Sequence, residues 1–404
     1  IIMANVSSSN GLEKRPKLRF PGFDEPYKQC RIGDIYAERS QRGASDMELL
    51  SVTMNDGVMP RSEIESKDNS SEDKSNYKVV LTGDMVYNSM RMWQGANGIS
   101  PCDGIVSPAY TVLMPKVPIS NGYFAAFFKS PNLINEFRRN SQGMTSDTWN
   151  LKYPQIETIK VCIPALSEQK RVSDMLGTLE RRIAKQAQLV DNLKKYKRGV
   201  MQRIFRQLPS QNGAEWTCVR LGDIFKKVSR RNTDGVIKNV ITNSAEYGLI
   251  PQRDFFDKDI AVDGNTANYY VIENGDFVYN PRKSNSAPYG PFNRYTLSEQ
   301  GIISPLYTCL VLQADISPSY LAWYFKSDAW YRYIYDNGSQ GVRHDRVSMT
   351  DDLLMGIPVM YPSHVKQLLY ADILDMVEAR LQATQKTLEL LSKTRDGYMR
   401  QLFI

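Results

Sequence analysis

The sequence predicts an α+β fold in which two similar globular domains are joined by two long antiparallel coiled-coil helices, with pseudo-twofold internal duplication. Motifs recur in the same order after about 195 residues, and an apolar heptad seam closes each copy. Size agrees, because the chain has 404 residues and a single core rarely grows past about 250–300 residues. With 42% hydrophobic and 24% charged residues, the composition is typical of folded domains and excludes a wholly disordered chain.

Six short motifs establish the duplication. The offset between the copies varies only from 189 to 198 residues, which is too long for a solenoid repeat and indicates duplication of a whole domain. Arg-Ile-Gly-Asp-Ile (31–35) returns as Arg-Leu-Gly-Asp-Ile (220–224), Gly-Asp-Met-Val-Tyr-Asn (83–88) as Gly-Asp-Phe-Val-Tyr-Asn (275–280), and Ile-Val-Ser-Pro-Ala-Tyr-Thr (105–111) as Ile-Ile-Ser-Pro-Leu-Tyr-Thr (302–308). Phe-Lys-Ser (128–130) returns at 325–327, Ser-Gln-Gly (141–143) at 339–341 and Ile-Pro (163–164) at 357–358.

Each copy has the same order of elements. Short β-rich runs come first, separated by Gly, Pro and Asn residues that favour turns. A short amphipathic helix follows, expected over 123–140 in the first copy and 320–335 in the second. The predicted divisions are a disordered or vector-derived N-terminus (1–15), a first domain (16–166), a central long helix (167–206), a second domain (207–363) and a C-terminal long helix (364–404).

The two closing helices share one seam. Apolar residues recur in steps of four and three, as at the a and d positions of a coiled coil, and each position of the second helix lies 198 residues after its counterpart. Polar interruptions at Gln186 and Lys197 recur as Thr384 and Arg395, and such residues fix register. The pairing seam is expected at Leu176, Leu179, Ile183, Gln186, Val190 and Leu193 and at Leu374, Val377, Leu381, Thr384, Leu388 and Leu391.

A seam of this kind needs a partner. Each helix could pack only on its own domain, but the shared polar positions favour pairing between the helices. About 38 helical residues span roughly 57 Å, so such a pair would hold two domains at a fixed separation, which suits two separated patches of one linear polymer. Both helices begin soon after a proline, with Ser167 and Ser363 as predicted N-caps.

The sequence lacks the residue patterns of several kinds of catalytic and metal-binding sites. The five cysteines form no Cys-x-x-Cys pair and there are two histidines, so a disulfide framework, a zinc site or a His-based catalytic centre is not expected. There is no P-loop, no Gly-x-Gly-x-x-Gly after a strand and no Asn/Asp-Pro-Pro-aromatic tetrapeptide of the amino-methyltransferase kind. We expect a binding protein without catalytic residues or metal. A reducing cytoplasm is the expected location, because neither a secretory signal nor a membrane-length apolar run is evident.

Loops that follow corresponding motifs carry side chains suited to DNA. Arg pairs well with guanine, and Asn or Gln with adenine, in the major groove. Solvation is the plainer interpretation of any single residue, but the frame motifs recur while the loop contents differ, as expected of two scaffolds that read different sequences. The candidates in the first copy are Arg39, Arg42, Arg91, Trp93, Gln94, Asn97, Gln142, Ser146 and Trp149. Those in the second copy are Arg230, Arg231, Arg282, Lys283, Asn285, Arg294, Gln340, Arg343, His344 and Arg346.

The net charge of +7 is concentrated in one element. Residues 167–206 hold 11 basic and 4 acidic side chains, and residues 364–404 hold 6 and 5, so the rest of the chain is close to neutral. The excess positive charge therefore belongs to the first long helix and not to the loops predicted to read bases. That helix is expected to lie near DNA phosphates, against an acidic partner surface, or both.

A further set of motifs is distinctive when taken together: Lys-Leu-Arg-Phe-Pro-Gly (17–22), Leu-Gly-Asp-Ile (221–224), Gly-Asp-x-Val-Tyr-Asn twice, Ile-Pro before each long helix and Ser-Glu-Gln-Lys-Arg (167–171). With these motifs and the duplication, residues 16–403 resemble the specificity (S, HsdS) subunit of type I restriction-modification systems. The second copy departs from the pattern, with Ser-His-Val-Lys-Gln (363–367) in place of Ser-Glu-Gln-Lys-Arg.

The resemblance implies two target recognition domains, each reading one half of a bipartite, asymmetric site in double-stranded DNA. It implies that the long helices act as a ruler for the unread spacer and dock two modification subunits, which carry S-adenosylmethionine and methylate adenine. Restriction subunits that use ATP and Mg for translocation and cleavage would join them. On this resemblance the chain itself is a non-catalytic recognition subunit that binds no cofactor and no membrane.

Two other functions remain open. A stand-alone sequence-specific DNA-binding regulator would bind its site tightly without partners. A divergent DNA methyltransferase or nuclease is the enzymatic alternative. The missing tetrapeptide counts against a methyltransferase, and a nuclease would rest on a lone Glu-x-Lys at 65–67 in a Ser-rich stretch.

Overall fold

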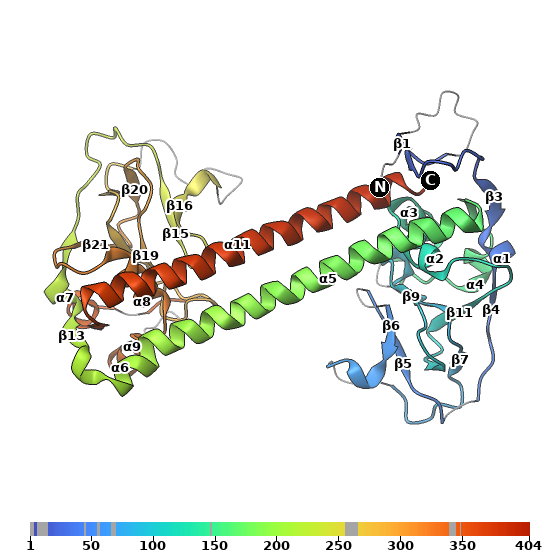
Figure 1. The fold of residues 1–404 in the computed structure, drawn as a ribbon, viewed down its shortest axis with the longest axis horizontal. Helices are drawn as coiled ribbons and strands as arrows, with labels where there is room; N and C mark the ends of the chain where they lie inside the picture. The colour runs from blue at the N-terminus through green and yellow to red at the C-terminus, as the bar shows by residue number, and fades with distance from the viewer. Residues whose placement is uncertain are drawn as a thin grey trace. The chain divides into compact units, whose positions relative to one another are not determined.

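The computed structural model describes residues 4–5, 15–43, 46–54, 57–65, 70–145, 148–254, 266–338, 345–347 and 349–404 (Figure 1). The chain forms two compact units, one made of Ile1–Gln188 and Gln385–Ile404 and the other of Leu189–Thr384. Each unit therefore contains one half of each long helix. Among the described helices, none is long and apolar enough to cross a membrane.

The first unit is built on a four-stranded antiparallel sheet, whose strands follow the order β4 (Tyr36–Glu38), β11 (Tyr110–Pro115), β8 (Met85–Asn88) and β9 (Asn97–Ile99). Further antiparallel pairs are β3 (Lys28–Arg31) with β12 (Lys160–Ile163), β5 (Leu50–Thr53) with β6 (Gly57–Pro60), and β7 (Lys78–Val80) with β10 (Gly104–Val106). The short helices are α1 (Ile32–Ile35), α2 (Asn121–Phe127), α3 (Pro131–Asn140) and α4 (Tyr153–Ile156), with 3-10 turns at Arg61–Glu63 and Met92–Gln94.

The second unit repeats this topology. Its four-stranded sheet has the order β14 (Phe225–Val228), β21 (Thr308–Leu312), β18 (Phe277–Tyr279) and β19 (Phe292–Arg294). The other antiparallel pairs are β13 (Thr217–Arg220) with β22 (Pro358–Tyr361), β15 (Ile241–Ser244) with β16 (Gly248–Pro251), and β17 (Tyr270–Ile272) with β20 (Gly301–Ile303). The short helices are α7 (Leu221–Ile224), α8 (Pro318–Lys326), α9 (Tyr331–Asn337) and α10 (Asp351–Met355), with 3-10 turns at Gly213–Glu215 and Gln252–Asp254. The predicted duplicated α+β fold is confirmed.

The repeated Gly-Asp motif has a structural reason in both units. Gly83 and Gly275 have φ of 90° and 97°, a left-handed conformation that glycine adopts without strain. The Asp84 carboxylate then accepts the Leu81 backbone N–H at 2.9 Å, and Asp276 accepts that of Glu273 at 2.9 Å. The motif therefore shapes the turn that enters β8 or β18.

The single short helix expected in each copy is two helices. In the first unit α2 ends at Phe127 and α3 begins at Pro131, directly after Ser130. Proline lacks an N–H and restricts the preceding residue to extended backbone, so a helix restarts at it and does not run through it. The second unit has the same break between α8 and α9, around Ser327.

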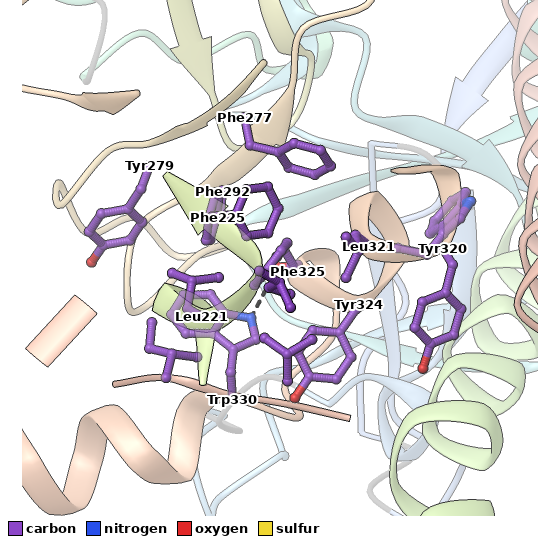
Figure 2. Packing of buried hydrophobic residues seen from close by; sticks show 14 of the residues in the cluster. Leu221, Phe225, Phe277, Tyr279, Phe292, Tyr320, Leu321, Tyr324, Phe325 and Trp330 are labelled. Carbon is purple, nitrogen blue, oxygen red and sulfur yellow. Dashed lines mark hydrogen bonds between the residues drawn. The ribbon is translucent and has the colours of Figure 1, made fainter. Parts of the chain in front are cut away.

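Aromatic side chains fill the core of the second unit (Figure 2). Phe292 of β19 stacks on Phe325 of α8, with ring centroids 4.0 Å apart. The fully buried Trp330 indole donates to the Phe325 carbonyl oxygen at 3.2 Å, so this bulky ring is also held by a hydrogen bond. The sheet and α8 are thereby fixed to each other beneath the loops that leave β18.

The long helices are α5 (Leu166–Gln202), which continues through a π-helical turn (Arg203–Gln207) into α6 (Leu208–Gln211), and α11 (His364–Gln401). Phe205, beyond the end of α5, packs on Tyr320 and Tyr324 in the second unit, with ring centroids 5.5 and 5.8 Å apart. Phe403, beyond the end of α11, packs on Tyr123 and Phe127 in the first unit, at 5.4 Å from each. Each long helix therefore ends in the core that the other copy forms.

Contacts within each unit show that α5 and α11 run antiparallel (Figure 1). In the first unit Leu176 and Leu402 share one core, and Arg395 lies 3.8 Å from Glu180. In the second unit Lys197 lies 2.6 Å from Glu378. All twelve residues of the predicted seam are buried or half-buried.

The starts of the long helices depart from the predicted N-caps in one copy. Ser363 directly precedes α11, as predicted, but Ser167 lies inside α5 and is not its cap. The residues that play the same role at the start of both long helices are instead Gln169 and Gln367, which are both buried. Gln169 accepts the Ser120 N–H at 3.1 Å and donates to the Pro164 carbonyl at 3.0 Å; Gln367 does the same with Ser317 and Pro362 at 2.8 and 2.9 Å.

Near the N-terminus, disorder is predicted for residues 1–15, yet Ala4–Asn5 form β1 against β2 (Leu18–Arg19). Residues 1–3 and 6–14 lie outside the described part. Arg19 is anchored in turn by a bidentate ion pair with the buried Glu168 of α5, at 2.8 Å for each bond.

Candidate nucleic-acid interface

In the first unit the two candidate loops lie side by side. Trp93, after β8, makes an edge-to-face contact with Trp149, after the Ser-Gln-Gly motif, with ring centroids 5.2 Å apart. The Leu151 N–H donates to the Ser89 carbonyl at 2.9 Å, which ties the bases of the two loops together. Arg138 places its guanidinium 5.8 Å from the Trp149 ring, a cation–π arrangement. The result is an aromatic and cationic surface built from segments about 55 residues apart.

The second unit joins the corresponding loops by backbone hydrogen bonds. Lys283 N–H donates to the Asp345 carbonyl and Val347 N–H to the Pro281 carbonyl, each at 2.9 Å. Arg282 and Arg346 thereby become partners in an antiparallel bridge. Two arginines are therefore presented at the place where the first unit presents two tryptophans.

Tyr307 of the repeated Ser-Pro-x-Tyr-Thr motif lies close to these arginines. Burial raises the pKa of its phenol, while the charges of Arg282 and Arg346 act in the opposite direction. This half-buried tyrosine was not a sequence candidate, and neither was Arg138. Arg138 could have been found from the sequence, because it lies in the last helical turn before the Ser-Gln-Gly motif.

Most described candidates are accessible to a ligand. The exposed ones are Arg42, Arg91, Gln142, Arg231, Arg282 and Asn285, and the half-buried ones are Trp93, Gln94, Trp149, Lys283 and Arg346. Ser146, Gln340, Arg343 and His344 lie outside the described residues, as does Lys67 of the Glu-x-Lys sequence. DNA contact by any of these residues stays a prediction.

Two of the candidate arginines are held in ion pairs with the repeated Gly-Asp motif. The Arg39 guanidinium bonds both oxygens of Asp84, at 2.6 and 3.2 Å, and Arg230 bonds Asp276. Arg230 also lies 3.2 Å from Glu273. Their contacts support a role in positioning the turn before β8 or β18.

Two candidates sit in the scaffold and not on a loop. Asn97 is fully buried in β9 and donates to the Gly95 carbonyl at 3.1 Å, so its prediction as a base contact is wrong in this structure. Arg294 ends β19, and its guanidinium reaches Ser319 of α8 at 3.4 Å. Burial lowers the pKa of Arg294, and its Nε has no hydrogen-bond partner among the described residues.

The chemistry of both loop pairs suits recognition. Guanidinium groups form bidentate bonds with guanine or with phosphate, and indole rings pack on bases or sugars. Within the described part of the chain, no three His, Cys, Asp or Glu side chains gather as metal ligands would. The arrangement provides contact surfaces at equivalent places on two scaffolds.

Comparisons with known proteins bear on this fold. Neither a protein-family model nor a curated protein sequence matches the chain. The type I restriction-modification S subunit from M. genitalium is similar in structure, with a TM-score of 0.57 and 13% identity over 96% of this chain and 99% of that one. A chain from a study of complex assembly and conformational transition of the type I R-M system is similar with a TM-score of 0.55 and 16% identity, over 94% of this chain and 98% of that one. The chain therefore has the fold of the specificity subunits of type I restriction-modification systems.

Proposed function

We propose that this chain is the DNA-recognition subunit of a type I restriction-modification complex and that each unit reads one half of a bipartite site in double-stranded DNA. The observation that carries the proposal is the joining of two loops at the same place on each duplicated scaffold. The scaffolds agree in strand order while the loops differ in side chains. Reading two different half-sequences requires this combination of a common frame and divergent contacts.

The two loop pairs are expected to read different bases. The first unit offers Trp93, Trp149 and the exposed Gln142, which suit apolar contact and adenine. The second unit offers Arg282 and Arg346, whose guanidinium groups suit guanine. We therefore propose an asymmetric site, with at least one guanine in the half read by the second unit.

The long helices have a proposed second task, the docking of two modification subunits. On α11, Val365, Leu368 and Leu369 are 77%, 47% and 53% exposed. Their spacing of three and four residues places them on one face of the helix. Exposed apolar side chains that line one helix face are typical of a protein interface. One structural relative comes from a study of complex assembly of the type I R-M system, which supports a docking role for this face.

In this proposal the reaction belongs to the partners. The modification subunits bind S-adenosylmethionine and transfer methyl groups to adenine, and restriction subunits use ATP and Mg. This chain would supply the recognition of the DNA sequence. DNA with a non-cognate sequence would be released before methyl transfer.

The test has two arms. Methylated adenines are mapped in host DNA with and without the gene for this chain, and a chain-dependent bipartite motif is expected. The purified chain is then incubated with DNA and S-adenosylmethionine, with and without a modification subunit, and methyl transfer is expected only with that subunit. Methyl transfer by the chain alone would overturn the proposal in favour of an enzyme, and tight site-specific binding with no chain-dependent methylation would favour a stand-alone regulator.

A further inference from the structure

A pocket rich in positive charge lies in the second unit, between the C-terminal half of α5 and the end of α8. Its volume is about 340 Å³. Four cationic side chains line it: Lys194, Lys197, Arg198 and Lys326. Three of these cations belong to α5, the helix that carries the excess positive charge of the chain, so part of that charge lines the pocket.

The cations in the pocket outnumber the carboxylates that could neutralise them. Lys197 pairs with Glu378, which lies outside the lining, at 2.6 Å. Asp328, the one acidic residue among the described residues of the lining, pairs with Arg206 at 2.9 Å. Among the described residues, Lys194, Arg198 and Lys326 form no ion pair within 4.0 Å.

Two of these ammonium groups lie near the same aromatic ring. Lys326 Nζ lies 4.7 Å and Lys197 Nζ 5.3 Å from the centroid of Trp323. Burial and the charge of Lys197 lower the pKa of Lys326, while the carboxylates of Glu378 and Asp375 act in the opposite direction. Lys326 remains exposed as a whole residue, so its ammonium group is desolvated on the side of Trp323 and open on the other. A bound anion would relieve this repulsion.

The corresponding place in the first unit keeps two of the four cations, Arg395 for Lys197 and Lys129 for Lys326, and loses the other two. The counterparts of Lys194 and Arg198, 198 residues later in the chain, are Ser392 and Asp396. Lys129, the counterpart of Lys326, donates to the Met54 carbonyl at 3.3 Å. The pocket is therefore a property of one unit and not a consequence of the duplicated fold.

A second pocket of about 190 Å³ adjoins the first and shares Lys197 and Lys326 with it. Its lining includes Ser286, Ala287 and Gly290, which belong to the same loop as Arg282, and it also includes Glu246 and the Glu378 that pairs with Lys197. The positive charge therefore lies next to the loop that we propose reads DNA bases. A ligand that reaches both places must be an extended anion, and the DNA backbone is one.

We propose that the pocket formed by Lys194, Lys197, Arg198 and Lys326 binds a phosphate of the DNA backbone beside the half-site read by the second unit. This inference rests on the proposed function and adds to it a sequence-independent contact found in one unit only. Lysine serves here as a mobile point charge, which suits a phosphate whose orientation varies with the DNA sequence. The contact would strengthen binding and set its position without choosing bases.

The test compares two double variants of the full chain, K194Q/K326Q in the pocket and K185Q/K195Q at exposed sites of the same helix outside it. Binding of a fluorescent duplex is measured by anisotropy over a series of salt concentrations. Each phosphate contact contributes about 0.9 to the slope of log affinity against log salt concentration. We expect K194Q/K326Q to lower the slope by about 1 and to weaken binding roughly five- to tenfold at 0.1 M salt, equally for all sequences.

Lysine acetylation of the wild-type chain gives a second readout that needs no variant. Duplex DNA should protect Lys194 and Lys326 from acetylation, and Lys195 should stay reactive. Equal slopes for the two double variants, or no protection, would overturn the phosphate site while leaving the proposed function intact. Unchanged DNA binding with weaker capture of the modification subunit would assign the pocket to an acidic protein surface instead. If the wild-type chain binds no duplex even together with the modification subunit, the proposed function itself fails.

Discussion

The ammonium group of Lys197 on α5 lies 2.6 Å from the carboxylate of Glu378 on α11. The counterparts of these residues in the other copy, Arg395 and Glu180, form the same pair at 3.8 Å. Each pair joins the acid of one copy to the base of the other, which is the arrangement that an antiparallel pairing of duplicated helices requires. The polar interruptions of the heptad seam at Lys197 and Arg395 therefore have partners.

We predict measurable coupling between Lys197 and Glu378. A double-mutant cycle with K197A and E378A should give about 0.5–1 kcal/mol, because both side chains are about three-quarters buried, at 25% and 27% exposed. The cycle with E180A and R395A should give less, since those side chains are 54% and 36% exposed and farther apart. Urea unfolding measures both cycles. A larger coupling for the exposed pair would contradict this account.

Gln169 and Gln367 are predicted to stabilise the starts of the long helices. Replacing either by alanine leaves a backbone N–H and a prolyl carbonyl without their partner in a buried site. The expected loss is about 1–3 kcal/mol for each variant. Thermal unfolding is the measurement, and Q188A, which alters an exposed glutamine of α5, is the matched control with a change within about 0.5 kcal/mol. Equal losses of stability in all three variants would show that the buried amides do not stabilise the starts of the long helices.

Arg19 and Glu168 are predicted to depend on each other. Both side chains are almost fully buried, at 4% and 1% exposed, and Tyr27 adds a hydrogen bond to Glu168 at 3.3 Å. R19A should lower the free energy of unfolding by about 3–5 kcal/mol, because it leaves a buried carboxylate without its cation. The apolar double variant R19M/E168L should cost much less than R19A. A double variant as unstable as R19A would show that the cost comes from lost packing and not from the unpaired charge.

Substitutions at the two loop pairs should change specificity in different half-sites. R346A should relax the half-site read by the second unit, with a loss of about 1–3 kcal/mol if Arg346 makes a bidentate base contact. W93A should affect only the other half-site. Sequencing of methylated adenines in cells that express each variant reads out both. Uniform weakening over all sites by R346A would instead identify a phosphate contact.

Much of the fold could be predicted because duplication shows it twice. The recurrence of Gly-Asp and of the polar seam positions indicated structural roles that single residues do not reveal. The joining of the Trp93 and Trp149 loops was not predictable, since the sequence does not show which loops a sheet brings together. Asn97 was misplaced because a polar residue after a strand was taken for a loop residue, whereas it belongs to the next buried strand. The pair of Arg39 with Asp84 could have been found, because both residues recur as Arg230 and Asp276.

The proposed ruler is tested most sharply by a four-residue insertion after Gln186 of α5. The insertion adds about 6 Å of helix, which corresponds to roughly two base pairs of DNA at 3.4 Å each. Mapping of methylated adenines should show the two half-sites unchanged and the spacer between them longer. An unchanged spacer, or an altered half-site, would contradict the assignment of recognition to the two units and of spacing to the helices.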